Sequence, residues 1–143
     1  MLVRLLYASR ALPTLDTEEL GAILRHSRHW NSKQGVTGVL CLCETASLFL
    51  QVLEGGRAPV NALYNRIVRD PRHSEVTLLA YEEIGERRFA GWSMGQVNMA
   101  RLNPALLLKY SETSTLDPWA VSGQAMAALF DEMVATAAIM GKA

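Results

Sequence analysis

A single carboxamide interrupts the most apolar stretch of the chain. Gln51 lies within residues 48–55, Leu-Phe-Leu-Gln-Val-Leu-Glu-Gly, which are apolar on both faces, as in a central strand covered on both sides. Because side chains alternate along a strand, Gln51 shares a face with Phe49 and Leu53. A buried carboxamide without partners costs about 1–3 kcal/mol. Gln51 therefore either bonds to backbone or water, or meets a flat ligand with polar edges.

Further polar or oxidisable side chains fall where the predicted elements bring them near Gln51. Tyr7 ends the first predicted strand, and Asn31 ends the first predicted helix on its sheet-facing stripe. Trp92 and Met94, two residues apart, share a face of the last predicted strand. The groove between the two helices would have apolar walls and few polar groups, which suits a planar ligand with a charged tail. Its predicted lining is Tyr7, Leu24, Asn31, Phe49, Gln51 and Ile67, with Arg66 and Asp70 at the mouth.

Other arrangements of reactive side chains favour no catalytic or metal site. His26 and His29 are three apart on a helix but have no third ligand, so solvated surface histidines are the better interpretation. Cys41 and Cys43 point the same way from one strand and are interpreted as small buried hydrophobes. The chain has no Gly-rich phosphate loop and no Gly-x-Ser-x-Gly motif. We expect a protein that is not an enzyme and holds no metal.

Composition narrows the class of protein further. The chain has 143 residues, of which 50% are hydrophobic, and its 14 basic residues balance 14 acidic ones. This length suits one domain with a substantial core. The balanced charge predicts neither nucleic-acid binding nor attraction to a membrane surface. Met1 leads directly into a strand-like stretch without a signal-peptide pattern, so we expect a cytoplasmic protein.

The periodicity of apolar residues predicts an α+β fold. The expected order is βαββαββ, which gives a ferredoxin-like mixed sheet with both helices on one face. Asp16, followed three residues later by Glu19, marks the first helix start, and Pro59 fits the first turn of the second helix. The predicted strands are residues 2–7, 35–43, 48–54, 76–81 and 92–98, and the predicted helices are residues 16–31 and 59–70.

The second face of this sheet needs a cover of its own. Leu6, Leu50 and Val52 alternate with Tyr7 and Gln51, and they are too apolar to lie in water. A C-terminal helical tail can cover them: residues 104–110 predict a short helix, and Asp117-Pro118 opens a longer one. We expect its apolar stripe also to contact another copy or a partner. That stripe carries Trp119, Met126, Leu129, Phe130, Met133 and Ala137.

Short motifs follow one another in a fixed order between residues 6 and 95. The motifs are Leu-Tyr-Ala-Ser at 6–9, Asn31, Gly-Val-Thr-Gly at 35–38, Phe-Leu-Gln-Val-Leu-Glu-Gly at 49–55, Leu-Tyr-Asn-Arg-Ile at 63–67, Asp-Pro-Arg-His at 70–73 and Trp-Ser-Met-Gly at 92–95. They resemble the motifs of the BLUF family of blue-light sensors that use FAD. Each is weak alone, but together and in register they are specific. The resemblance covers roughly residues 2–100, and the length is similar to the short BLUF proteins with only a helical tail.

The resemblance implies that FAD is held non-covalently between the two helices. Tyr7 matches the tyrosine that donates an electron to excited flavin, Gln51 the glutamine between that tyrosine and the ring, and Asn31 the asparagine that bonds the ring. Trp92 and Met94 match the pair that relays the signal, and which of them lies nearer the ring is left open. The residues that the resemblance places around FAD are Tyr7, Leu24, Ser27, Arg28, Asn31, Phe49, Gln51, Arg66, Ile67, Asp70 and His73.

Two features of the sequence depart from the family pattern. Trp30 replaces a smaller polar residue or histidine, and the loop at 44–47 is about two residues longer than usual by comparison with common hairpin loops.

We expect residues 1–100 to form the light-sensing domain and residues 101–143 the output segment, which signals through a homo-oligomer or a downstream protein. A flavin-binding electron-transfer protein and a cofactor-free ferredoxin-like interaction module are the alternatives.

Overall fold

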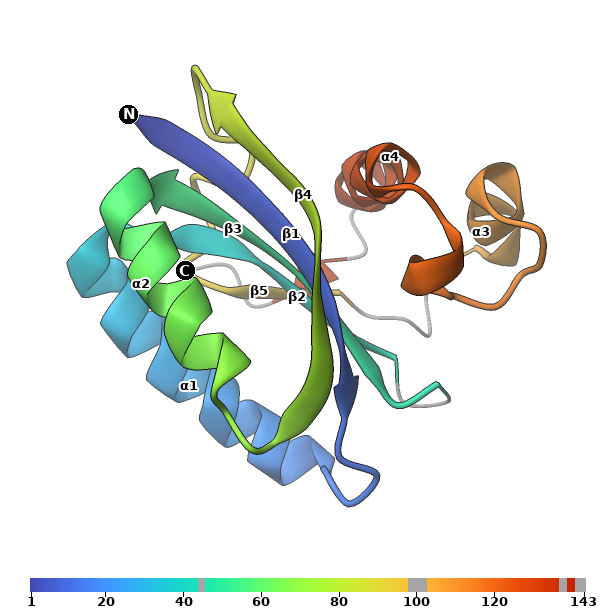
Figure 1. Ribbon diagram of the computed structural model, residues 1–143, viewed down its shortest axis with the longest axis horizontal. Coiled ribbons are helices and arrows are strands. Elements are labelled where there is room, and N and C mark those ends of the chain that lie inside the picture. The colour runs from blue at the N-terminus through green and yellow to red at the C-terminus, as the bar shows by residue number, and fades with distance from the viewer. Residues whose placement is uncertain (44–45, 98–102, 137–138, 141–143) are drawn as a thin grey trace.

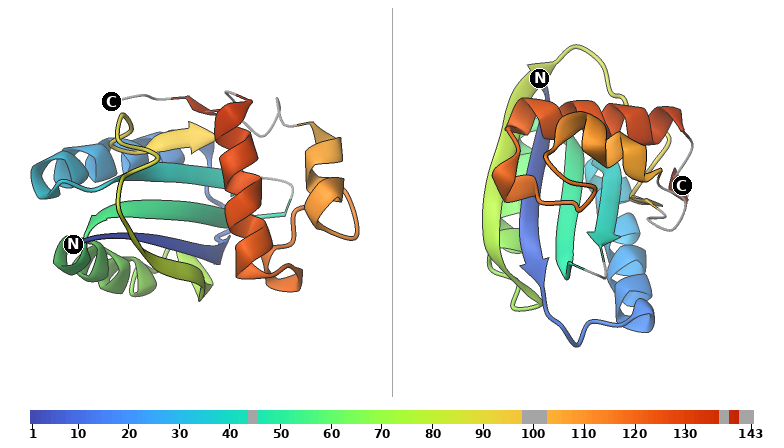
Figure 2. Two further views of the ribbon diagram at one scale, coloured as in Figure 1. Left: turned by 90° about the horizontal axis from the view of Figure 1, so that it is seen from above. Right: turned by 90° about the vertical axis from the view of Figure 1, so that its right-hand side faces the viewer.

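The protein is a sheet that separates two groups of helices (Figure 1). The structure is a computed structural model, and it describes residues 1–43, 46–97, 103–136 and 139–140. Helices α1 (Thr17–Gln34) and α2 (Arg57–Val68) cover one face of the sheet. Helices α3 (Pro104–Tyr110) and α4 (Gly123–Ala135) lie on the other side, where α4 crosses the strands (Figure 2). This arrangement confirms the predicted α+β class and the predicted position of the tail.

The sheet has the strand order β4-β1-β3-β2-β5-β6. Its two central strands, β1 and β3, are antiparallel neighbours, and β5 pairs with β2 in parallel. The predicted βαββαββ order is therefore confirmed, with a two-residue strand of the tail added at one edge. The strands are β1 (Leu2–Ala11), β2 (Thr37–Cys43), β3 (Leu48–Gly56), β4 (His73–Ile84), β5 (Gly95–Val97) and β6 (Ile139–Met140).

Local signals in the sequence set the ends of α1. The Asp16 side chain accepts a hydrogen bond from the backbone N–H of Glu19 at 2.8 Å, which satisfies one free amide of the first turn. At the other end Gly35 takes φ of +68°, the left-handed conformation that glycine adopts readily, and its backbone N–H donates to the carbonyl oxygen of Asn31. The helix therefore runs to Gln34, one turn beyond the predicted end.

The second half of the tail differs from the prediction of one long helix after Asp117. A short 3₁₀ helix, η2 (Pro118–Ala120), is followed by Val121 in an extended conformation, with φ −121° and ψ +145°. The Ser122 hydroxyl then accepts from the N–H of Ala125 at 3.1 Å and starts α4 afresh. A serine that caps a new helix thus divides the expected one. Ala137, the last predicted member of its apolar stripe, lies outside the described residues.

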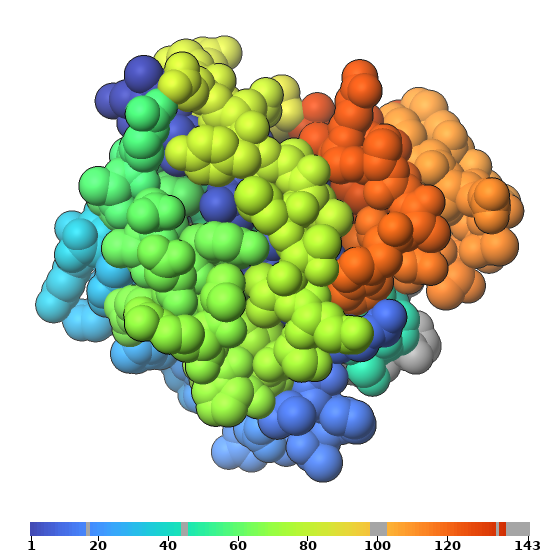
Figure 3. Space-filling model, in the orientation of Figure 1, coloured from blue at the N-terminus to red at the C-terminus, as the bar shows by residue number. Residues whose placement is uncertain are grey.

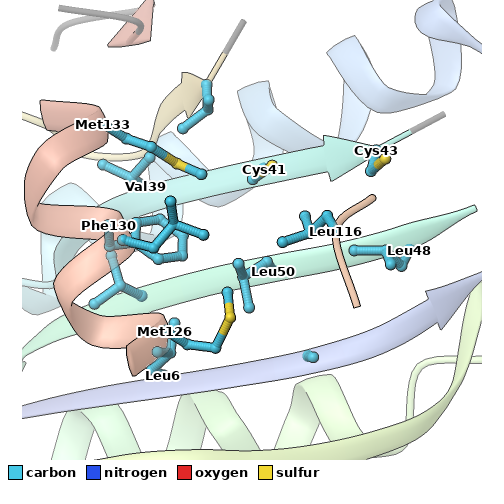
Figure 4. Close-up of a cluster of buried hydrophobic side chains, with 14 of the residues drawn as sticks. Leu6, Val39, Cys41, Cys43, Leu48, Leu50, Leu116, Met126, Phe130 and Met133 are labelled. Atoms are coloured by element: carbon cyan, nitrogen blue, oxygen red, sulfur yellow. The ribbon is translucent and has the colours of Figure 1, made fainter. Parts of the chain in front are cut away.

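Two apolar cores occupy the two faces of the sheet. Leu6, Leu50 and Val52 belong to the tail-side core, where they meet side chains of α4 such as Met126 and Phe130 (Figure 4). The pocket-side core, under α1 and α2, contains Tyr7, Phe49 and Leu53 from the same strands, together with Leu24. This division confirms the predicted register, because strand side chains alternate between faces. Cys41 and Cys43 are buried on one face, as predicted.

The tail docks on β4 through close contacts. A side chain on Gly123 would place its Cβ only 1.8 Å from the carbonyl oxygen of Leu79, so only glycine lets α4 begin here. The indole N–H of Trp119 donates to Thr77 Oγ1 at 3.0 Å, and the Arg10 guanidinium lies 4.3 Å from the Trp119 ring centroid. These contacts fix η2 and the start of α4 against β1 and β4.

The surface available to a second copy or a partner differs from the one that we expected. Met126, Phe130 and Met133 are at most 2% exposed, so the apolar stripe of α4 faces the sheet. The exposed large hydrophobic side chains include Leu78 and Tyr81 on β4, a sheet-edge strand that lies on the visible face of the molecule (Figure 3). No helix in the described part of the chain is long and apolar enough to cross a membrane.

Candidate functional site

A pocket opens between α1 and α2 above the central strands. Its cavity volume is about 180 Å³, and it is open to solvent at its mouth. The lining combines residues from both helices, from β1 to β3, and from the turn before β4. Of the residues that the family resemblance placed around FAD, those that line it are Tyr7, Ser27, Asn31, Phe49, Gln51, Arg66, Ile67, Asp70 and His73.

A line of hydrogen bonds crosses the floor of the pocket. Tyr7 and Gln51 are direct partners across β1 and β3, and the Tyr7 hydroxyl donates to Gln51 Oε1. The amide nitrogen of Gln51 donates in turn to the Met94 sulfur at 3.2 Å. Burial raises the pKa of Tyr7 far above its usual value, so the phenol is protonated and acts as the donor at neutral pH. Gln51 thus holds an oxidisable phenol at one end and a thioether at the other.

Trp92 and Met94 do not share a face, which corrects the prediction of a regular strand over residues 92–98. The chain bends at Ser93 and Met94, and β5 begins only at Gly95. Met94 is fully buried in the pocket-side core, whereas Trp92 is half-buried and packs against the tail-side core. Strand alternation does not apply through a bend. The structure therefore places Met94 beside Gln51, and Trp92 beneath the tail; Asn98 lies outside the described residues.

Asn31 has one satisfied and one unsatisfied end. It is 1% exposed, and its amide nitrogen donates to the carbonyl oxygen of Ser93 at 2.9 Å. Its Oδ1 is buried without a hydrogen-bond partner among the described residues, although Asn31 lines the pocket. An orphaned acceptor of this kind costs about 1–3 kcal/mol. A ligand with a ring N–H, such as a flavin, fits this acceptor.

Leu24 and Arg28, also expected around FAD, have other surroundings. Leu24 is buried in the pocket-side core and does not line the pocket itself. Arg28 donates from Nε to the carbonyl oxygen of Met94 at 2.9 Å, so it holds the backbone next to the pocket floor. A direct role for either residue in binding the ring stays a prediction.

The mouth of the pocket carries charged and aromatic side chains. Arg66 places its guanidinium 5.2 Å from the centroid of the Trp30 ring, the residue that departs from the family pattern. Asp70 pairs with Arg72, whose side-chain hydrogen bonds hold the pKa of that carboxyl below its usual value. The predicted position of Arg66 and Asp70 at the mouth agrees with these contacts.

His73 is bound within the protein on both sides of its ring. Its Nε2 donates to the carbonyl oxygen of Ile67 at 2.5 Å, and its Nδ1 lies 2.7 Å from the Ser9 hydroxyl. The ring also meets Tyr7 and Phe49 edge-on. His73 therefore ties the end of α2 to β1 at the pocket wall, a role that the sequence did not indicate.

The sequence reasoning missed part of the lining. Ile23, Leu40 and Leu63 also line the pocket, and they are apolar residues of predicted helices and strands, so their positions follow from periodicity. His26, which was interpreted as a surface residue, is exposed at the rim. Arg72, within the Asp-Pro-Arg-His motif at 70–73, lines the pocket as well. No group of three or more potential metal ligands occurs among the described residues.

The ferredoxin-like sheet, the pocket between its two helices and the Tyr7–Gln51 pair together define an α+β domain with a candidate ligand pocket on one face of its sheet. The chain belongs to the BLUF family, described as sensors of blue light using FAD, which it matches over residues 2–95. It is therefore a blue-light sensor of a family that binds a flavin. The Tyr7–Gln51 hydrogen bond fits the network of this family.

Several curated relatives are much longer than this chain. The beta subunit of a photoactivated adenylate cyclase from Euglena gracilis is 36% identical over 94 residues, which are 65% of this chain and 11% of that protein. The blue light- and temperature-regulated antirepressor BluF of Escherichia coli is 30% identical over 89 residues, which are 62% of this chain and 22% of that protein. The chain therefore matches only a small part of the length of these relatives.

Solved structures extend the similarity to the tail. The photo-activated state of BlsA matches with a TM-score of 0.82 and 30% identity over 94% of this chain and 95% of that chain. The dark-state structure of the BLUF protein BlrB matches with a TM-score of 0.78 and 32% identity over 95% and 96% of the two chains. The chain is thus similar to these BLUF proteins over nearly their whole length.

Proposed function

We propose that this protein binds FAD non-covalently in the pocket between α1 and α2 and changes the hydrogen-bond pattern around Gln51 on illumination. One observation supports the proposal most directly: two hydrogen bonds link Tyr7 and Gln51 on the pocket floor to the sulfur of Met94. Nearby, the buried Oδ1 of Asn31 has no hydrogen-bond donor among the described residues. Both features suit a ring with polar edges.

The charges at the pocket mouth support FAD over a flavin without phosphates. Arg66 and Arg72 line the open end of the pocket, and both have exposed side chains. Guanidinium groups present planar forks of donors that suit phosphate oxygens. Asp70 already pairs with Arg72, so Arg66 is the first candidate for a phosphate contact.

A bound flavin absorbs blue light and is a strong oxidant in its excited state, which is the chemistry that the cofactor supplies. Tyr7 is the residue on the pocket floor that can lose an electron. Its hydroxyl proton already lies on a hydrogen bond to Gln51 Oε1, so the proton can leave along that bond. Burial of Tyr7 excludes water from this path.

Gln51 supplies the two-state element. Its carboxamide has donors at one end and acceptors at the other, and both ends are engaged here, by Tyr7 and Met94. Reorganisation of this amide would break the contact with the Met94 sulfur. A flexible thioether can repack in response. A switch of this kind needs two arrangements of similar free energy.

The output of the switch is proposed to leave through residues 101–143 as a change of assembly or of partner binding. Met94 lies at the boundary between the pocket and the chain that leads into the tail. The outer face of the tail, with Leu108 at 54% exposure, and the exposed Leu78 and Tyr81 of the sheet-edge strand β4 offer surface for a second copy or a partner. Residues 1–100 would then form the sensing unit.

Absorption spectra of the purified protein in darkness and under blue light test the proposal. The protein should be yellow, shift its flavin band slightly to the red under light, and return in darkness, and the flavin released on denaturation should be FAD. Protein that stays colourless after incubation with FAD would favour a cofactor-free interaction module. Bleaching with turnover of a nicotinamide would favour an electron-transfer protein.

Two substitutions locate the switch. Tyr7→Phe keeps the ring and removes the oxidisable hydroxyl, so flavin should stay bound while the red-shifted state is lost. Gln51→Leu should give the same loss, because leucine fills the space and cannot rearrange hydrogen bonds. A normal red-shifted state in Tyr7→Phe would remove this residue from the mechanism.

A further inference from the structure

A buried carboxylate lies outside the pocket, three residues beyond Gln51 on the same strand. Glu54 is completely buried, and it is on the tail side of β3 because strand side chains alternate. A buried charge is strongly unfavourable unless it is paired and hydrogen-bonded. The hydrogen-bond partners of Glu54 therefore show how its buried charge is stabilised.

Glu54 binds the loop between β4 and β5. Its carboxylate accepts from the backbone N–H of Phe89 at 2.7 Å and from that of Arg88 at 3.1 Å. On its other side it accepts from the guanidinium of Arg4, with Nε at 2.7 Å and Nη2 at 2.6 Å. Charge-assisted bonds of this kind are about twice as strong as neutral ones. Glu54 thus fixes the point at which Arg88 and Phe89 cross the central strand β3.

Residues 88–94, which we term the relay segment, are irregular but held at successive backbone groups. The Phe89 carbonyl accepts from the N–H of Trp92 at 3.0 Å, and the Trp92 carbonyl accepts from the N–H of Gly38 at 2.9 Å. The next two carbonyls accept from Asn31 and Arg28 of α1, each at 2.9 Å. The position of Met94 therefore depends on Glu54 at one end of the segment and on α1 at the other.

The relay segment contacts both faces of the sheet. Phe89 is 1% exposed in the tail-side core, and the Arg88 side chain forms an ion pair with Asp131 of α4. Met94, at the other end, contacts Gln51 in the pocket-side core. A shift of this segment would consequently change packing against α4 and the contact with Gln51 together.

We propose that Glu54 is a positioning residue of the light switch, which holds the relay segment so that Met94 stays on Gln51 and Phe89 stays under α4. The proposal rests on the flavin-based switch described above and adds the element that couples it to the tail. A glutamine at this position could not replace the carboxylate. Its amide end would point a donor at either the two backbone N–H groups or the Arg4 guanidinium, and so lose one set of bonds.

The test compares Glu54→Gln with Glu82→Gln in the flavin-loaded, full-length protein. Glu82 accepts from the same Arg4 guanidinium at 2.8 Å, but its side chain is 58% exposed, and within the described part of the chain it forms no hydrogen bond with the relay segment. The readout is the methyl NMR signal of Met94 in ¹³C-methyl-methionine protein kept in darkness. Glu82→Gln should keep the wild-type signal. Glu54→Gln should move or split it, because Met94 leaves its single position on Gln51.

A second readout follows the coupling to the tail. Light-minus-dark hydrogen exchange over residues 123–135 should be lost or reduced severalfold in Glu54→Gln and unchanged in Glu82→Gln. In darkness, the amides of residues 88–94 should exchange about tenfold faster in Glu54→Gln, as expected for a locally loosened segment. Glu54→Asp keeps the charge and withdraws the carboxylate by one methylene, so it should give an intermediate effect. This variant carries the test if Glu54→Gln does not fold.

The outcomes separate this inference from the proposed function. A wild-type protein without a light-induced red shift would overturn the proposed function itself. A photoactive wild type in which Glu54→Gln and Glu82→Gln behave alike, in the Met94 signal and in exchange, would overturn the role of Glu54 and leave the switch intact. A displaced Met94 signal with unchanged exchange in α4 would show that Glu54 does not couple the segment to the tail, and would also overturn the inference.

Discussion

The two faces of the sheet use the same strands for different purposes. On the pocket side, Tyr7 and Gln51 lie at the floor of an open cavity, and Asn31 leaves a buried acceptor unsatisfied. On the tail side, Leu6 and Leu50 alternate with those residues and are packed under α4, and the buried carboxylate of Glu54 on that side is fully hydrogen-bonded. The pocket side thus holds features that are unfavourable in the absence of a ligand, whereas the tail side combines apolar packing with a paired buried charge.

This contrast shows how a small domain can tolerate a switch in its core. A cavity and an orphaned acceptor each lower the free energy of unfolding. Dense packing on the opposite face of the same strands offsets that loss. The switch residues can then be replaced with little effect on folding, whereas the covering residues cannot.

The largest expected effect separates the two faces with one substitution made on each. Leu50→Ala, on the tail side, should lower the free energy of unfolding by about 2–5 kcal/mol, because it opens a cavity where the side chain is completely buried. Leu40→Ala, on the pocket side, should cost less in flavin-free protein, because this side chain already borders the pocket. Denaturant unfolding measures both. Equal losses would contradict the contrast between the faces.

The next effect concerns how closely the tail approaches the sheet. Gly123→Ala should lower the free energy of unfolding by about 1–3 kcal/mol, because the new Cβ cannot sit 1.8 Å from the Leu79 oxygen. Gly21→Ala is the matched control in α1. Its nearest neighbour would be the mobile end of Arg25 at 3.4 Å, so it should be neutral or stabilise by up to about 1 kcal/mol. Thermal unfolding distinguishes the two outcomes.

A smaller effect is expected for the orphaned acceptor of the pocket. Asn31→Ala should weaken flavin binding by about 1–2 kcal/mol, roughly tenfold in the dissociation constant, because the ring loses a buried partner. Asn65→Ala, at an exposed position of α2 outside the pocket lining, should leave binding unchanged. Flavin retention during dialysis and fluorescence titration measure the difference. Unchanged binding in Asn31→Ala would mean that Oδ1 does not meet the ligand.

The smallest effect is a pH dependence at the pocket mouth. The pKa of Asp70 is lowered from 3.8 chiefly by its hydrogen bonds to the Arg72 side chain. The contribution of the ionised Asp70 to the free energy of unfolding is therefore complete above its pKa in the unfolded chain. It is lost as the pH falls through the lowered pKa of the folded protein. Asp70→Asn should cost less than about 1 kcal/mol near neutral pH and nothing in strong acid. In an Arg72→Met background the pH dependence of this difference should largely disappear.

Regular periodicity explains what could be predicted from the sequence. Alternation along β1 and β3 placed Tyr7 and Gln51 on one face and Leu6 and Leu50 on the other, and the structure confirms both. The helix cap at Asp16 was predicted from its spacing to Glu19 because capping is a local interaction. The local capping rule and the alternation of strand side chains were sufficient to predict these strand faces and this helix start.

The features that escaped prediction depend on contacts between distant residues. The buried ion pair of Glu54 could not be predicted from its place at the end of the predicted strand 48–54, because its partners Arg4 and Phe89 lie 50 and 35 positions away. Trp92 and Met94 were assigned to one face, because a bend has no periodic signature in the sequence. His73 gave no sign of its bond to Ser9, which needs the pairing of β1 with β4.

The environment of Trp119 makes this side chain an internal reporter of the tail. Its indole N–H is bonded to Thr77, and the Arg10 cation lies over its ring. Indole fluorescence responds in wavelength and lifetime to solvent and to nearby charge. The chain has 3 tryptophans, so replacing Trp30 and Trp92 with phenylalanine would leave one emitter at the junction of η2 with β4. Separation of the tail from the sheet would then be visible as a red shift of emission, without an attached dye and on the timescale of a single light pulse.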